Sequence, residues 1–144
     1  MATKVFLAVS RNDFTHYNLG RESFWCFYKN SKVLQGDLLL MYKSKHGIYQ
    51  VYEVIQIPSD IKEFDCQYRD MVTVKTKLLL TFENPLTFND MKNDDFLSTI
   101  GPVRRKFQNL LFTLKEDELD AILSLIKKAN PGTTDFFKEY TFKE

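Results

Sequence analysis

The stretch that decides the fold begins with Trp25-Cys26-Phe27-Tyr28 and resumes after a short break with Gly36-Asp37-Leu38-Leu39-Leu40-Met41-Tyr42. A third segment, Ile48-Tyr49-Gln50-Val51-Tyr52-Glu53-Val54-Ile55, follows directly. Aromatic and β-branched residues are frequent in these segments, and such residues favour strands. The pattern therefore predicts a small β-rich core and places the only tryptophan beside two consecutive strands of it.

The composition limits the class of protein. A chain of 144 residues fits one domain, which can bury roughly two-thirds of its unfolded surface. Its aromatic fraction of 15%, against only 5 glycines, predicts a core built from rings, with some rings left over for a binding surface. The formal net charge of +1 excludes a polycation that coats nucleic acid nonspecifically.

The distribution of charge is more informative than its sum. Basic residues outnumber acidic ones in residues 1–57, and acidic ones are in excess in residues 58–101. An anionic ligand is therefore expected to prefer the N-terminal portion together with the Arg104-Arg105-Lys106 cluster. A solvated charged face explains the same distribution.

The cysteines and the hydropathy bear on the compartment. Cys26 and Cys66 lack the spacing of metal ligands, and in a chain of this size a reduced intracellular pair is expected rather than a disulfide scaffold. No apolar run approaches the roughly 18 residues that a membrane span needs. The sequence thus predicts a cytoplasmic protein without a membrane partner.

Apolar and alternating runs predict five or six strands. Residues 72–82 alternate most clearly, which predicts a long, half-exposed antiparallel strand with Thr73, Lys75, Lys77 and Thr81 on its outer face. Gln35-Gly36-Asp37 predicts a turn, and residues 43–47 predict a hairpin loop that ends on a glycine of positive φ. The predicted strands span residues 4–10, 23–28, 38–43, 48–57, 72–82 and 110–114.

The C-terminal part is predicted to be helical. Short elements are expected near residues 87–93 and 94–100, before a break at Gly101-Pro102. Thr113 and Glu116 match a T-x-x-E capping box, so a longer helix is expected to open there and to end at Asn130-Pro131-Gly132. We therefore expect one domain over residues 1–130 and a tail or linker over 131–144. The tail either leads into a further segment or docks back through its aromatic residues.

Catalysis has few candidate residues. The histidines, His16 and His46, belong to no metal or nucleophile motif, and no Gly-rich phosphate loop is present. His46 is predicted to be a plain solvated loop residue. The sequence therefore predicts no enzyme, no metal and no cofactor.

Binding has more candidates, because a flat ring at the mouth of a small barrel is a surface on which a nucleobase can stack. Trp25 supplies one ring, and Tyr42 or Phe14 a second. Polar groups at strand ends can contact the base edge, and cations nearby can contact phosphates. The candidate base-binding residues are Trp25, Ser10, Asn12, Tyr42, Ser44 and Cys26, and the candidate phosphate-binding residues are Arg11, Arg21, Lys43, Lys45, Arg104 and Arg105. Core packing of Trp25 and ordinary solubility of the cations are the alternatives.

The order of these segments resembles the PUA-like superfamily, especially its EVE and YTH branches. The segments that match the EVE pattern are VFLAVSRND (5–13), SFWCFYK (23–29), QGDLLLMYKS (35–44), GIYQVYEVI (47–55) and LTFNDMKNDDFLSTIGPVRRKFQNLLFTLKEDELDAIL (86–123). The resemblance covers residues 4–127. It implies an α+β fold, a small twisted β-barrel of five to six mostly antiparallel strands flanked by helices, with a pocket for a flipped, often modified base.

The Trp25-Cys26 pair is also similar to the YTH segment in which a tryptophan begins the aromatic cage for a methylated adenine. The resemblance implies that Trp25 is a cage wall and that Ser10 and Asn12 line the pocket mouth. YTH cages use a second tryptophan, which this chain lacks. A Phe or Tyr then replaces it, or the pocket reads a different base.

The last nine residues, FFKEYTFKE (136–144), resemble the segment that leads into the GTPase motor of McrB-type restriction proteins. The resemblance implies a DNA-specificity module of a modification-dependent restriction system, linked to a motor domain and acting with a nuclease partner. The alternatives are a protein-interaction or oligomerisation domain, an RNA-binding PUA-like domain, and a sensor of free nucleotides.

Overall fold

The computed structural model describes residues 4–10, 20–28, 32–57, 71–106 and 111–131. Six strands, three short helices and one longer helix lie in these ranges. They are β1 (Val5–Ser10), β2 (Glu22–Tyr28), β3 (Leu38–Lys43), β4 (Gly47–Gln56), β5 (Met71–Leu86), α1 (Phe88–Lys92), the 3-10 helix η2 (Leu97–Thr99), α2 (Gly101–Arg104), β6 (Leu111–Thr113) and α3 (Glu116–Ala129).

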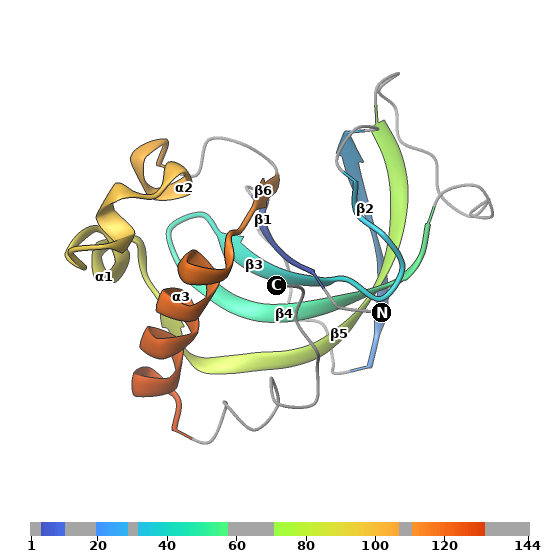
Figure 1. Cartoon of the computed structure of the whole chain (residues 1–144). Coiled ribbons are helices and arrows are strands. Elements are labelled where there is room, and N and C mark those ends of the chain that lie inside the picture. Colours follow the sequence, from blue (N-terminus) through green and yellow to red (C-terminus); the bar gives the residue numbers. More distant parts are fainter. Residues whose placement is uncertain (1–3, 11–19, 29–31, 58–70, 107–110, 132–144) are drawn as a thin grey trace.

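All six strands form one curled sheet in the order β2-β5-β4-β3-β1-β6. β1 pairs with β3 in parallel, and the other neighbouring pairs are antiparallel. Figure 1 shows the sheet bending into a half-barrel, with the helices gathered at the end away from β2. The predicted α+β architecture of a small, mostly antiparallel barrel flanked by helices is confirmed.

The two faces of the sheet carry two separate apolar clusters. Because side chains alternate along a strand, Val5, Leu7 and Val9 of β1 enter one cluster, and Phe6 and Ala8 enter the other. We call the first the helix-side cluster, since it also contains the buried residues of α3. We call the second the β2-side cluster. Its members are Phe6, Ala8, Phe27, Leu39, Met41, Tyr49, Tyr52, Val54, Val74 and Leu78, with Trp25, Val33, Ile57 and Leu111 packed against it.

β5 serves both clusters because its register shifts against β4. Val51 pairs with Leu80 and Tyr52 with Leu78, which leaves Leu79 as an extra residue between them. The strand therefore gives Leu78 to the β2-side cluster and Phe82 to the helix-side cluster.

The predicted half-exposed antiparallel strand over residues 72–82 is present, and it is longer than predicted, because β5 runs from Met71 to Leu86. On its predicted outer face, Lys77 and Thr81 are exposed, but Thr73 is buried. Thr73 pairs with Cys26 of β2, and on the other face of β5 the Thr76 Oγ1 lies 3.0 Å from Ser23 Oγ. The alternation of the sequence does not reveal that β2 pairs with this part of β5.

The starts of the helices also differ from the predicted ones. α3 begins at Glu116 with Lys115 as its N-cap, and Thr113 is the last residue of β6. The Glu118 carboxylate accepts a hydrogen bond from the Lys115 backbone N–H at 2.8 Å, so it satisfies the first turn in place of the predicted Thr113–Glu116 box. The predicted break at Gly101-Pro102 is in fact the first turn of α2, where a proline costs no hydrogen bond.

The predicted turn before β3 is confirmed, and its aspartate has a structural task. Gly36 has φ +94°, and the Asp37 side chain is buried, with 4% of its surface exposed. Its carboxylate accepts hydrogen bonds from the backbone N–H groups of Leu34 at 2.9 Å and of Lys4 at 3.3 Å. Asp37 thereby joins the turn to the residue that precedes β1.

Candidate nucleic-acid interface

Trp25 lies on β2 and is only partly buried. Its ring packs against the β2-side cluster, where it meets the Tyr52 ring edge-on at 5.3 Å between centroids and stacks on Phe27 at 6.2 Å. Both neighbours are buried, so the indole covers the cluster and leaves part of its own surface to solvent. Trp25 therefore combines both roles that the sequence allows, a packing ring and an accessible ring.

Polar groups hold the orientation of the indole. Trp25 Nε1 donates to Ser23 Oγ at 3.1 Å, and Ser23 Oγ lies 3.0 Å from Thr76 Oγ1 on β5. Behind the ring, the Tyr52 hydroxyl donates to Gln50 Oε1 at 2.9 Å. Because Ser23 of the same strand is itself held by Thr76 of β5, and because the ring also packs on Tyr52 of β4, the indole is preorganised rather than free to rotate.

Cys26 points to the opposite side of β2 from Trp25, as strand alternation requires. It is disulfide-bonded, so the expectation of a reduced cysteine pair is wrong. The other cysteine of the chain, Cys66, lies outside the described residues. A sulfur engaged in a disulfide has no S–H to offer to a base, which removes the thiol donor from the candidate set at Cys26.

Three of the predicted residues meet where β1 ends. Ser10 is buried and pairs with Lys43, the last residue of β3. The Ser44 backbone N–H donates to the Ser10 carbonyl oxygen at 3.0 Å, so the β3–β4 hairpin is fixed to β1. Ser10 and Lys43 alternate with residues of the helix-side cluster, which places them on the β2-side face.

Tyr42 lies on the other face. It belongs to the helix-side cluster, and 7% of its surface is exposed. Burial raises the pKa of its hydroxyl above the ordinary value, and burial does the same to the pKa of Tyr49. Trp25 and Tyr42 thus pack against different clusters, and the structure does not bring these two rings together as the walls of one cage.

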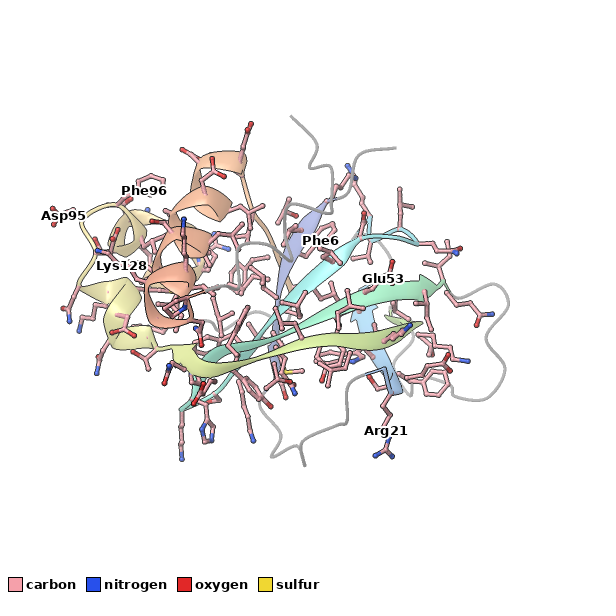
Figure 2. The ribbon with its side chains drawn as sticks, turned by 90° about the horizontal axis from the view of Figure 1, so that it is seen from below. Phe6, Arg21, Glu53, Asp95, Phe96 and Lys128 are labelled. Carbon is pink, nitrogen blue, oxygen red and sulfur yellow. The ribbon has the colours of Figure 1, made fainter. Side chains whose placement is uncertain are left out.

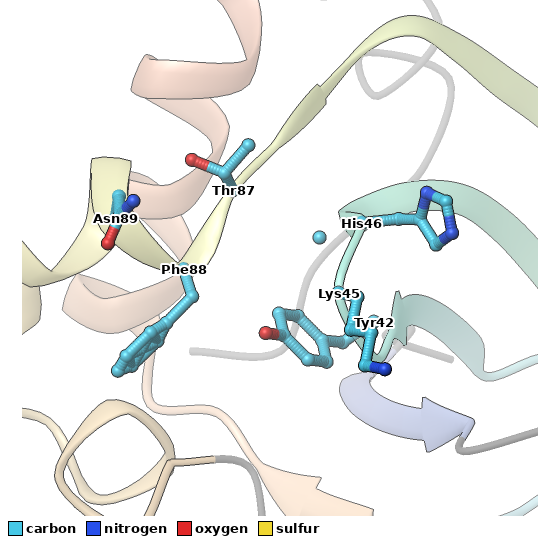
Figure 3. A pocket seen from close by; sticks show the side chains of 7 residues that line it. Tyr42, Lys45, His46, Thr87, Phe88 and Asn89 are labelled. Carbon is cyan, nitrogen blue, oxygen red and sulfur yellow. The ribbon is translucent and has the colours of Figure 1, made fainter.

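A pocket of about 320 Å³ opens beside Tyr42. The hairpin supplies one wall and the start of α1 the other, as Figure 3 shows. The predicted residues Tyr42 and Lys45 line it together with His46, Gly47, Thr87, Phe88 and Asn89.

Sequence reasoning missed most of this pocket. His46 was predicted to be a plain solvated loop residue; it is exposed, and it also lines the pocket. Phe88 and Asn89 follow the predicted start of a short helix, and no sequence signal connects them to residues 42–47. The connection arises because Ile48 pairs with Leu86, which lies just before α1.

The remaining predicted cations belong to other segments of the chain than the hairpin. Arg21 precedes β2, and Figure 2 shows its side chain extending away from the sheet at that end. Arg104 and Arg105 are exposed at the end of α2. Arg11, Asn12 and Phe14 lie outside the described residues.

The described part of the chain offers neither a metal site nor a membrane-spanning helix. Its His, Cys, Asp and Glu side chains form no group that could hold a metal ion. None of its helices is long and apolar enough to cross a membrane.

Solved structures share the fold at low sequence identity. Protein PSPTO5229 from Pseudomonas syringae is 19% identical, with a TM-score of 0.64, over 85% of this chain and 99% of its own. Protein Atu2648 from Agrobacterium tumefaciens is 18% identical, with a TM-score of 0.62, over 90% and 97%. A hypothetical protein from Leishmania major is 15% identical, with a TM-score of 0.62, over 88% and 96%.

The sequence comparisons are more decisive for the family. No curated protein matches the chain significantly. The EVE domain family, however, matches residues 4–125, which include every described strand and most of α3. The chain therefore belongs to the EVE domain family, and its architecture is that of a PUA-like nucleic-acid-binding module.

Proposed function

We propose that this domain recognises a flipped, modified base, and that the accessible part of Trp25 provides the surface on which the base stacks. The observation that carries the proposal is the state of this ring. It is partly exposed, it rests on two buried aromatic residues, Phe27 and Tyr52, and its Nε1 is fixed by Ser23. A ring that is already oriented loses little conformational entropy when a base stacks on it.

The polar groups at the end of β1 are proposed to act with Trp25. Ser10 and Lys43 lie on the β2-side face, against which Trp25 also packs. Ser10 and Asn12 are proposed to contact the base edge, and Lys43 and Arg21 to contact phosphates. Hydrogen bonds to base edges give specificity, whereas phosphate contacts give affinity and orientation.

At the level of the whole protein, we propose a specificity domain over residues 1–130 that binds DNA in a modification-dependent restriction system in the cytoplasm. The resemblance of residues 136–144 to the segment before an McrB-type GTPase supports a linked motor domain and a nuclease partner. The domain is proposed to bind rather than to catalyse, without a cofactor.

The test uses the single tryptophan as its own reporter. Duplexes that differ only in one methylated base are titrated into the protein while the Trp25 fluorescence is recorded. Stacking of the modified base on the indole is expected to quench this fluorescence and to give tighter binding than the unmodified duplex.

Variants then separate stacking from folding. Trp25→Ala is expected to weaken binding of the preferred duplex by about 10- to 100-fold, the equivalent of about 1–3 kcal/mol per stacked base. The matched control is Phe24→Ala, which removes the neighbouring ring, next to Lys75 and Glu22. Circular dichroism checks that both variants fold. Equal affinity of wild type and Trp25→Ala for every duplex contradicts the proposal, and tighter binding of RNA or concentration-dependent self-association favours the alternatives.

A further inference from the structure

The pocket between the β3–β4 hairpin and α1 lies on the opposite face of β3 from the β2-side cluster, and the base-reading proposal leaves it unused. Its lining is chemically one-sided. Lys45 and His46, which carry side-chain nitrogen donors, lie at its rim, and no carboxylate lines the pocket among the residues that the structure describes. The carboxylate of Asp90, in α1, is directed to the Thr87 backbone N–H at 3.1 Å.

Further hydrogen-bond donors complete the lining. The Thr87 hydroxyl accepts from the Asp90 backbone N–H at 3.1 Å, so its own proton remains available for a ligand. The Asn89 side chain is exposed at the same edge and offers an amide N–H₂ group. Figure 3 shows the Tyr42 hydroxyl pointing toward the Phe88 side of the pocket, between the two walls.

The two walls are held in fixed positions. Gly47 has φ +113°, and a Cβ at this position would lie 2.3 Å from the Leu86 carbonyl oxygen. The hairpin therefore touches the end of β5 directly, immediately before the residues that form the other wall. Lys45 has φ +71°, a left-handed conformation that costs a non-glycine residue about 1 kcal/mol or more. Such a conformation is often kept where it directs a side chain toward a ligand.

We propose that this pocket binds a phosphate group, with Lys45 and His46 as the principal contacts and Thr87 and Asn89 as further donors. The chemistry of the site stands on its lining alone. We assign this phosphate to the backbone of the bound nucleic acid, and that assignment rests on the proposed function. The hairpin then contacts nucleic acid on two faces, through Lys43 on the β2-side face and through Lys45 and His46 in the pocket.

The first experiment tests the chemistry of the pocket without nucleic acid. Inorganic phosphate, a nucleoside monophosphate and a short single-stranded oligonucleotide are titrated separately into ¹⁵N-labelled protein. The amide signals of Gly47, Thr87 and Asn89 are expected to shift with all three probes. Saturation by the nucleoside monophosphate at lower concentration than by the oligonucleotide would assign the site to free nucleotides and overturn the backbone contact. Absence of any shift with all three overturns the phosphate site.

The second experiment tests the contact with nucleic acid. Lys45→Ala is expected to weaken the binding of modified and unmodified duplexes equally. It is also expected to reduce the slope of the logarithm of the binding constant against the logarithm of the salt concentration by about 1. The matched control is Lys92→Ala, which removes an exposed lysine from the last turn of α1, outside the lining. If the two variants behave alike, the pocket does not bind the backbone. The outcome is separable from that for Trp25, since loss of the tryptophan changes discrimination between duplexes and loss of Lys45 changes only their common affinity.

Discussion

At the scale of single residues, the most recognisable motif of the sequence has a structural task. Gly36 and Asp37 are among the most recognisable residues of the sequence pattern, yet Gly36 supplies a positive φ and Asp37 a buried carboxylate that satisfies two backbone N–H groups. Both residues shape the entry to β3. The residues that carry the proposed chemistry, Trp25 and Lys45, lie on either side of this motif in the chain.

Gly47 provides the sharpest prediction for a single residue. Gly47→Ala combines an unfavourable φ with a direct clash against the Leu86 carbonyl, so we expect a loss of about 2–4 kcal/mol in the free energy of unfolding. Gly36→Ala has the same type of φ but open space, and is expected to cost about 1 kcal/mol. Gly101→Ala has neither problem and is expected to be nearly neutral. Urea unfolding of the three variants measures the series, and equal losses at Gly47 and Gly36 would show that the close approach is unimportant.

A strand or helix was predictable from the sequence where its own run of apolar residues indicates it, without knowledge of the neighbouring elements. The apolar runs of β1, β3 and β4 are fully or mostly buried, and the sequence indicates them directly. The start of α3 was misplaced because Thr113 satisfies the capping pattern but is required for pairing with Phe6. The extra residue Leu79 lies in a run of three leucines, in which no change of pattern marks the shift of register.

The position of α3 depends on a pair of asparagines. Asn130 is buried, its Oδ1 accepts from the Asn84 backbone N–H at 2.9 Å, and its Nδ2 donates to the Asn84 carbonyl at 2.9 Å. Asn130→Ala leaves these β5 backbone groups unsatisfied, and we expect a loss of about 2–3 kcal/mol. Asn84→Ala removes only an exposed side-chain bond to Ala129 and is expected to cost about 1 kcal/mol or less. Hydrogen exchange of the α3 amides and urea unfolding test both values. A smaller loss for Asn130→Ala than for Asn84→Ala contradicts this account.

At the scale of the whole molecule, the order of the strands in the sheet could not be predicted from local sequence patterns. The parallel pairing of β1 with β3 and the position of β2 at the far edge join segments that are distant in sequence. The same applies to the candidate site. Trp25 and Lys45 were predictable as a ring and a cation, but the separation of Trp25 from Tyr42 depends on which face of the curled sheet each residue occupies. The wall at Phe88 and Asn89 depends on the pairing of β4 with β5.

The stability of the whole domain is expected to fall at alkaline pH. Burial raises the pKa of Tyr42 and Tyr49 in the folded protein, so the folded state keeps these protons at a pH where the unfolded chain, with a pKa of about 10, releases them. Stability from this source is complete below about pH 10 and is lost as the pH rises further. Urea unfolding at pH 8 and above pH 10 measures the loss. Tyr42→Phe is expected to reduce the dependence on pH, and an unchanged dependence in this variant would contradict the assignment.

The place of β1 in the sheet also sets the order in which the newly made chain can complete its fold. β1 is the first described strand to leave the ribosome, and all of its residues, which are apolar except for Ser10, are buried in the finished sheet. One side of it is covered once β3 is made, but the other stays uncovered until Leu111–Thr113 have been synthesised. For roughly a hundred residues of synthesis, β1 therefore presents an open, apolar edge to other nascent chains. The short strand β6 then pairs with Phe6, Leu7 and Ala8 and takes the place of β1 as the edge strand of the sheet.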